Sequence, residues 1–88
     1  MRFEWDEDKN RQNIAKHGID FADAQYVFAD SHYIDIYDVD HSDDEDRWWV
    51  IGNIGYLAVV VVTYREGDIV RIISARRAER KERRLYYG

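Results

Sequence analysis

The sequence predicts a small α+β domain with the element order β-α-α-β-β-β-α and a mostly antiparallel sheet flanked by helices. Three observations lead to this fold class. Residues 56–64 form a run of apolar and aromatic side chains without polar alternation, which is typical of a strand covered on both faces. Capping patterns divide the N-terminal third into two short helices, and the chain ends in an arginine-rich helical stretch. We expect the helices to lie on one side of the sheet.

The N-terminal residues predict a short edge strand, 2–5, followed by a helix over residues 7–17. Asp6 is a suitable N-cap, because its carboxylate can accept hydrogen bonds from the free N–H groups of the first turn. Gly18 stands at the position after the helix where a left-handed backbone is favoured. The apolar face of this helix is thin, consisting mainly of residues 14–15, so it must lean on its neighbours.

A second helix is predicted over residues 21–29. Asp20 can cap its N-terminus, and Phe21 and Phe28 recur at the spacing of one helix face. His17, in the last turn of the first helix, is explained by its place there, because a cationic side chain is favoured at a helix C-terminus.

The middle of the chain is predicted to form a hairpin with an acidic loop. Residues 32–39 alternate between apolar and polar side chains, and residues 47–51 return as the second strand. The loop shares spacings with an EF-hand calcium loop at Asp38, Asp40, Ser42, Asp44 and Asp46. Asp43 stands where that loop requires glycine and Trp49 where it requires glutamate, so a solvated turn is the preferred interpretation.

The C-terminal third is predicted to contain a tight turn at 65–68, a strand at 69–74 and a helix from 75 to 87. Eight basic residues stand against four acidic ones between residues 65 and 84, whereas the whole chain has a net charge of −5. Helical spacing would align five arginines in one stripe: Arg76, Arg77, Arg80, Arg83 and Arg84. Such a stripe favours phosphate binding, although a solvated helix face explains the same pattern.

Composition limits the classes of function. The 88 residues suffice for one domain, and the lack of cysteine excludes disulfides and thiolate metal sites, which fits a reducing cytoplasm. The longest apolar run falls well short of the ~20 residues that a membrane helix needs. Three Trp, seven Tyr and three Phe are more than a core of this size encloses, so we expect some of them at an interface with a protein partner.

Several segments, in order along almost the whole chain, carry a family resemblance: Phe3–Asp6, Lys16–Ile19, Asp46–Arg47, Val59–Arg65, Arg71–Ala78 and Glu82–Tyr86. Together they resemble the BrnT family of type II toxins, and the run from Arg71 to Ala78 is the most specific of them. The resemblance implies a RelE- or ParE-like fold and a small ribonuclease that inhibits translation. It also implies a cognate ribbon-helix-helix antitoxin, which neutralises the toxin and with it represses their operon.

The activity implied by this resemblance, metal-free RNA cleavage, needs a base, cations that hold the phosphorane, and an acid for the leaving oxygen. We expect arginines to supply the cations and to meet at one phosphate. The predicted catalytic residues are Arg65, Arg76, Arg80 and Glu79. The predicted RNA-binding residues are Arg47, Arg77, Arg83 and Arg84. The base stays open among Glu79, Glu66, Tyr86 and His17, and no metal or other cofactor is expected.

Four aromatic residues alternate on adjacent predicted strands, and only one face of a strand can belong to the core. The predicted antitoxin-binding residues are Tyr33, Tyr37, Trp48 and Trp49. We expect a hetero-oligomer with the antitoxin, contact with operator DNA only through that antitoxin, and no membrane association. The net charge of −5 supports an alternative, a non-catalytic binding or co-repressor module that acts with its DNA-binding partner.

Overall fold

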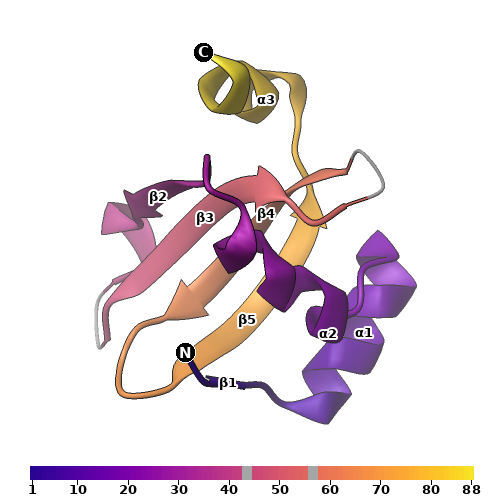
Figure 1. The fold of residues 1–88 in the computed structure, drawn as a ribbon. Helices are drawn as coiled ribbons and strands as arrows, with labels where there is room; N and C mark the ends of the chain where they lie inside the picture. The colour runs from indigo at the N-terminus through magenta and orange to yellow at the C-terminus, as the bar shows by residue number, and fades with distance from the viewer. Residues whose placement is uncertain (43–44, 56–57) are drawn as a thin grey trace.

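The computed structural model describes residues 1–42, 45–55 and 58–88, in which a mixed sheet is flanked by short helices (Figure 1). The strand order in these ranges is β1-β5-β4-β3-β2, with β1 parallel to β5 and the other neighbours antiparallel. The strands are β1 (Phe3–Glu4), β2 (Ile34–Tyr37), β3 (Arg47–Asn53), β4 (Val59–Arg65) and β5 (Val70–Arg77). The predicted α+β class and mostly antiparallel sheet are confirmed. The predicted element order is one strand short, because four strands, not three, lie between the second helix and the last helix in these ranges.

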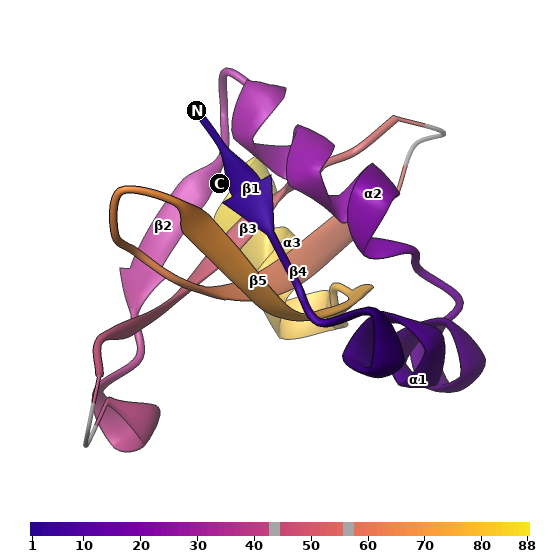
Figure 2. The same ribbon diagram turned by 90° about the horizontal axis from the view of Figure 1, so that it is seen from below.

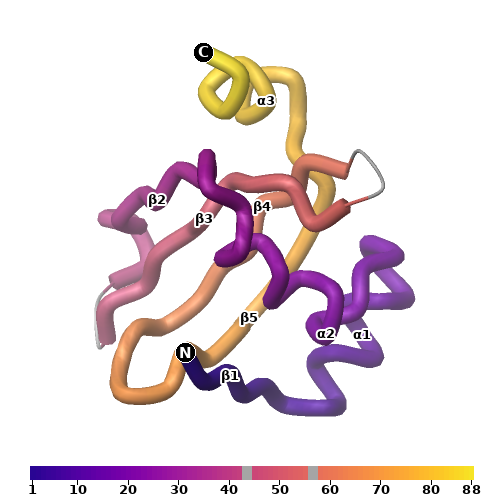
Figure 3. The backbone as a smooth tube through the Cα atoms, in the orientation of Figure 1, coloured from indigo at the N-terminus to yellow at the C-terminus, as the bar shows by residue number. Residues whose placement is uncertain are grey.

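The helical elements are α1 (Glu7–His17), α2 (Phe21–Ala24), the 3-10 turns η1 (Gln25–Ala29) and η2 (Val39–His41), and α3 (Arg80–Tyr87). α2 and η1 lie over one face of the sheet and α3 lies on the other side (Figure 2). The expectation that the helices share one side is therefore wrong. The two ends of the chain lie far apart, and α3 stands at the end of the molecule opposite the N-terminus (Figure 3). In the described ranges no helix is long and apolar enough to cross a membrane.

The central strand β4 buries side chains on both faces, as the sequence predicted. Val60 and Val62 are fully buried and pack with Phe21 in the core beneath α2 and η1, on what we call the α2 face. Val59 and Val61 point to the opposite side, the α3 face, where they pack against the end of the chain. Residues 56–57, where this strand was predicted to begin, lie outside the described residues.

The helix α1 has the predicted bounds and caps, but polar side chains make its buried face. Asp6 accepts from two N–H groups of the first turn, and Gly18 has a φ of 72°. Asn10 and Asn13 are buried, whereas Ile14 is 40% exposed. The predicted apolar face at residues 14–15 is therefore wrong, because α1 runs beside the edge of β5 and satisfies backbone polar groups there instead of filling a core.

Asn13 provides that edge contact. Its amide donates to the carbonyls of Ile19 and Ala75, both at 2.9 Å, and its oxygen accepts from the Ala75 N–H at 3.1 Å. Among the described residues, the short strand β1 pairs with β5 only at Val70 and Arg71. The amide of Asn13 therefore takes the place of a neighbouring strand further along β5.

The last helix begins five residues later than predicted, at Arg80 instead of residue 75. Arg76 and Arg77 belong to β5, where they pair with Val61 and Val60 of β4, and α3 begins only at Arg80. The predicted helical stripe through residues 76 and 77 is therefore wrong. Backbone pairing with the central strand outweighs the helix propensity of the two arginines, since tertiary context commonly overrides propensity and the pairing satisfies their N–H and C=O groups.

Other element bounds differ by a few residues. β2 covers residues 34–37 instead of 32–39, and β3 extends to Asn53 instead of ending at residue 51. The second predicted helix divides into α2 and η1. Asp30, which follows η1, holds this region to the rest of the fold, because its carboxylate accepts from the Asn53 N–H at 2.8 Å and from the Tyr86 hydroxyl of α3.

Candidate active site

The α3 face of the sheet carries polar side chains from three adjacent strands. Cross-strand partners lie on the same face, so the register places Trp49 beside Thr63, and Thr63 beside Ser74. Two of the pockets that the described residues form on this face are lined by side chains of β3 and β4. The larger, the His41 pocket, has a volume of about 240 Å³ and is lined by Asp38, Asp40, His41, Trp49, Val61, Thr63 and Arg76. The smaller, the arginine pocket, has a volume of about 110 Å³ and is lined by Asp6, Lys9, Glu45, Arg47, Arg65, Arg71, Ile72 and Ile73.

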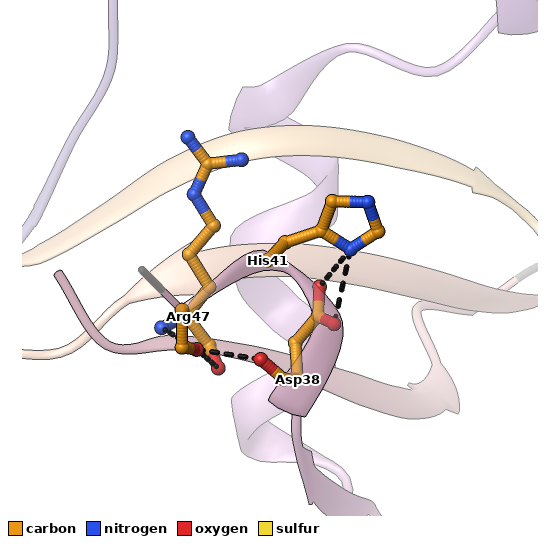
Figure 4. A network of polar contacts seen from close by, with 4 residues as sticks. Asp38, His41 and Arg47 are labelled. Carbon is orange, nitrogen blue, oxygen red and sulfur yellow. Dashed lines mark hydrogen bonds and ion pairs between the residues drawn. The ribbon is translucent and has the colours of Figure 1, made fainter. Parts of the chain in front are cut away.

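A histidine oriented by a carboxylate stands at the first pocket. The Nδ1 atom of His41 lies 3.1 Å from each oxygen of the Asp38 carboxylate, as the dashed lines in Figure 4 show. The Asp38 side chain is 13% exposed, and the His41 side chain is 68% exposed. An ionised carboxylate can only accept, so Nδ1 is the donor in this contact, and a neutral imidazole in this tautomer has its lone pair on Nε2. This arrangement orients a proton-transfer group while leaving it accessible.

The turn that presents this pair is held by backbone contacts. The Asp38 N–H donates to the Arg47 carbonyl at 2.9 Å. The Ser42 hydroxyl donates to the Asp38 carbonyl at 2.6 Å and accepts from the Arg47 N–H at 3.0 Å. These bonds continue the pairing of β2 with β3, and η2 with His41 therefore has a fixed position beside the sheet.

Arg76 lines the other side of the His41 pocket and is anchored by a buried carboxylate. Its guanidinium donates to both oxygens of Glu82, at 2.7 and 2.5 Å, and its side chain stays 36% exposed. The hydrogen bond from Arg76 lowers the pKa of Glu82 against the opposing effect of burial, and the same bond raises the pKa of Arg76. A bidentate pair of this kind fixes the plane of the guanidinium, which can still donate to an anion in the pocket.

The remaining predicted arginines are distributed over other surfaces instead of meeting at one point. Arg47 and Arg65 line the arginine pocket, where Arg65 forms an ion pair with Glu45. Arg77 is exposed near the end of β5. Three others line a wide, shallow surface on α3 together with Tyr87 and Gly88: Arg80, Arg83 and Arg84. The expected meeting at one phosphate is therefore not found, because β5 extends through residue 77 and α3 diverges from it.

Glu79, a predicted catalytic residue, occupies the N-cap position of α3. Its backbone N–H donates to the Glu82 carboxylate at 2.8 Å, and its carbonyl accepts from the Arg83 N–H at 2.9 Å. The residue lines neither of the two pockets on the α3 face. Its position at the N-cap fits a structural role in helix initiation.

The four predicted antitoxin-binding aromatics do not form one patch. Tyr37 and Trp48 are cross-strand partners whose ring centroids lie 5.1 Å apart, and Trp48 packs on the core of the α2 face. Trp49 projects to the opposite face and lines the His41 pocket. Tyr33 is 41% exposed and contacts the ring of Phe28. The alternation predicted from the sequence thus separates Trp48 from Trp49.

Sequence reasoning missed the His41 pocket. The spacing Asp38-x-x-His41 was available, but it falls in an irregular turn where no periodicity indicates which side chains face the sheet. Among the described residues, no three His, Cys, Asp or Glu side chains gather as metal ligands. The calcium alternative depends in part on Asp44, which lies outside those residues, and the Asp38 carboxylate is directed at His41.

Comparisons with known proteins agree with this fold. A family model described as a ribonuclease toxin, BrnT, of type II toxin-antitoxin systems matches residues 5–82. The crystal structure of the Brucella abortus ribonuclease toxin BrnT is similar, with a TM-score of 0.65 and 30% sequence identity over 91% of this chain and 99% of that one. No curated protein sequence matches the chain.

These matches define the class of protein: it is a toxin of the type II toxin-antitoxin class, whose activity is balanced by an antitoxin partner. Within that class the chain belongs to the BrnT family of ribonuclease toxins. The resemblance seen in the sequence is confirmed.

Proposed function

We propose that this chain is an endoribonuclease that cleaves RNA in the His41 pocket without a metal ion, and that it inhibits translation in the cytoplasm. The observation that carries the proposal is the Asp38–His41 pair on one side of that pocket and the Glu82-anchored guanidinium of Arg76 on the other. The family description supports RNA as the substrate class, and the geometry of the pocket supports the chemical roles proposed below.

In the proposed reaction, Nε2 of His41 takes the proton of a ribose 2′-hydroxyl, and the alkoxide attacks the adjacent phosphorus. The P–O5′ bond then breaks, which leaves a 2′,3′-cyclic phosphate and a 5′-hydroxyl. The proton on His41, or one from water, neutralises the leaving oxygen. Asp38 holds the imidazole in place and stabilises its charged form during the reaction.

Arg76 and Trp49 serve binding and charge stabilisation in this proposal. The guanidinium of Arg76 donates to the phosphorane oxygens, where negative charge develops. The half-buried indole of Trp49 lines the same pocket and offers a surface on which a base can stack, worth ~1–3 kcal/mol per base. Our predictions for the arginines of α3 as RNA contacts remain predictions.

The test uses the purified chain, a fluorescent oligoribonucleotide and excess EDTA. We expect cleavage, 2′,3′-cyclic phosphate ends, and no cleavage at a position where a 2′-deoxynucleotide is inserted. His41→Ala and Asp38→Asn should lower kcat by about 100-fold and 10-fold respectively, since general acid–base catalysis contributes about 10²–10⁴. His32→Ala is the matched control, because His32 is exposed and lines neither pocket on the α3 face.

Equal activity of His41→Ala and the parent chain would refute the role of His41. Arg76→Gln is expected to lower kcat as well, but Glu82 then loses its partner, so its folded state must be checked by circular dichroism. Glu82→Gln offers a complementary variant, which keeps the guanidinium but removes its anchor.

We propose that the antitoxin is a ribbon-helix-helix protein that forms a hetero-oligomer with this chain and carries the complex to operator DNA. The exposed rings of Tyr33 and Tyr37, 41% and 39% exposed, support an aromatic contact with it.

The alternative, a non-catalytic co-repressor module, is favoured by the net charge of −5. Expression of the chain alone separates the two, because only an active ribonuclease should arrest growth, and the His41→Ala variant should relieve that arrest.

A further inference from the structure

The arginine pocket has a charge arrangement that the cleavage mechanism does not use. Arg47 is the direct cross-strand partner of Arg65, and Arg65 is the direct partner of Arg71. Three adjacent strands thus carry one row of like charges, which we call the arginine row. Like charges placed directly opposite one another destabilise a sheet, so this row costs folding free energy unless an anion lies against it.

Among the residues that the structure describes, the carboxylates around the row neutralise it only in part. Four cationic residues line the pocket, Lys9 and the arginine row, against two acidic ones, Asp6 and Glu45. The Asp6 carboxylate accepts the N–H groups that begin α1, and Glu45 pairs with Arg65. Arg71 has a looser partner outside the lining, Glu4, at 3.5 Å. The part of the lining that the structure describes therefore has a net positive charge, in a chain whose total is −5.

Two side chains of the row remain partly accessible to a ligand. Those of Arg65 and Arg71 are 31% and 33% exposed. The buried Nε atom of Arg47 has no hydrogen-bond partner among the residues that the structure describes. The pocket volume of about 110 Å³ is several times the ~30 Å³ share of one water molecule in the liquid, which leaves room for a phosphate group.

The position of the row relates it to the His41 pocket. Thr63 and Trp49 line the His41 pocket. On β4, Arg65 lies two residues after Thr63, and on β3, Arg47 lies two residues before Trp49, so all four side chains share one face of the sheet. Two residues of a strand span ~7 Å, so the two pockets are neighbours along the strands. An extended single strand of RNA that places one phosphate in the His41 pocket can therefore place a flanking phosphate on the arginine row.

We propose that the arginine row, with Lys9, is a phosphate subsite for a nucleotide flanking the cleaved bond. This inference rests on the proposed ribonuclease function and adds a substrate class to it: single-stranded RNA with at least one phosphate beyond the scissile one. The row binds the chain of the substrate and takes no part in the proton transfers. A substrate with a single phosphodiester bond leaves the row empty and gains nothing from it.

The first experiment measures binding, so that it does not depend on cleavage. The probe is a fluorescent ten-nucleotide single-stranded DNA, which has no 2′-hydroxyl and cannot be cleaved, titrated with the chain at several salt concentrations. We expect Arg65→Gln and Arg71→Gln each to weaken binding about tenfold at low salt, as expected for the loss of a charged hydrogen bond. The slope of log K against log salt should fall by about 0.7 for each lost phosphate contact.

Two further variants make the binding test specific. Arg11→Gln removes the same charge from an exposed pair on α1 that lines neither pocket on the α3 face, and it should leave the salt slope unchanged. Glu45→Gln releases Arg65 from its ion pair and should strengthen binding by a few-fold, a gain that a purely structural role of this pair does not predict.

The second experiment compares cleavage of a diribonucleotide with cleavage of a ten-nucleotide RNA. Arg71→Gln should lower kcat/KM for the longer substrate about tenfold, mainly through KM, and leave the diribonucleotide unaffected. Equal losses of kcat/KM on both substrates would overturn the subsite. The subsite would also be overturned if Arg65→Gln and Arg71→Gln bound DNA with the same affinity and salt slope as the control Arg11→Gln. If the chain binds DNA through the row but cleaves no RNA, the proposed reaction fails and the phosphate site stands.

Discussion

Replacing Asn13 by alanine tests whether a side-chain amide holds the outer edge of β5. The amide makes three hydrogen bonds to buried backbone groups of Ile19 and Ala75, and Asn13 is only 7% exposed. At about 1 kcal/mol per bond, their loss costs about 3 kcal/mol. The higher helix propensity of alanine returns about 0.5 kcal/mol, so we expect a net loss of about 2.5 kcal/mol in the free energy of unfolding. That is a large part of the total for a domain of this size.

The assay is urea unfolding followed by the fluorescence of the three tryptophans. With a slope of about 1 kcal/mol per molar, the midpoint should fall by about 2.5 M. Gln12→Ala is the matched control, because Gln12 is the exposed neighbour on the same helix and should change the midpoint little. The reasoning about the edge is refuted if the two variants unfold at the same urea concentration.

A second substitution separates hydrogen bonding from packing. Asn13→Asp keeps the oxygen that accepts from the Ala75 N–H but replaces the NH₂ group that donates to two carbonyls. At neutral pH it should destabilise the chain at least as much as alanine, since the carboxylate then faces two carbonyl oxygens. Acidification should recover part of the loss because a protonated carboxyl can donate. Because Ala75 directly precedes Arg76, the same variants should also reduce ribonuclease activity.

Two other predictions concern the packing of β3 and the attachment of α3. Gly52→Ala should lower the free energy of unfolding by about 1–3 kcal/mol, since a Cβ at this position would lie 2.6 Å from Cγ2 of the fully buried Val27. The control is Gly67→Ala, where the nearest atom to a Cβ lies at 3.7 Å, and it should be near neutral in the same urea titration. Tyr86→Phe, which removes the hydrogen bond to Asp30, should lower the free energy of unfolding by about 1 kcal/mol at pH 7. Burial raises the pKa of Asp30, but the hydrogen bonds from Tyr86 and the backbone outweigh it and hold that pKa below its ordinary value. The stability that comes from a lowered carboxyl pKa is present above the pKa of the unfolded chain and is lost as the pH falls through the pKa of the folded chain. The difference in unfolding free energy between the parent and Tyr86→Phe should therefore shrink in acid. A difference that stays constant with pH would show that Asp30 is not involved.

The sequence predicted elements best where the local pattern and the tertiary environment agree. Helix α1 has its predicted bounds, because Asp6 and Gly18 act within one turn of the backbone they cap. Strand β4 was predicted to be covered on both faces, because a run of valines without polar alternation is typical of a buried strand. The family resemblance rested on residue order along the chain, and it too was confirmed.

Predictions failed where a side chain's surroundings depend on distant segments. Helical spacing placed Arg76 and Arg80 on one stripe, but the backbone of residues 76–77 pairs with β4, and the two arginines now line different pockets. The apolar content of α1 did not indicate that its buried face would be amide groups. No local rule indicated that η2 would present His41 to a pocket whose other side is formed by Arg76.

The amino-acid sequence by itself therefore determined the fold class, the caps of α1 and the family, because each of these is encoded in contiguous residues. Only the tertiary structure decided which side chains share a pocket. Strand register places Arg47, Arg65 and Arg71 in one row, and a turn between two strands places His41 near Arg76. Such neighbours are far apart in the chain, and a shift of one residue in the register would turn each strand side chain to the other face.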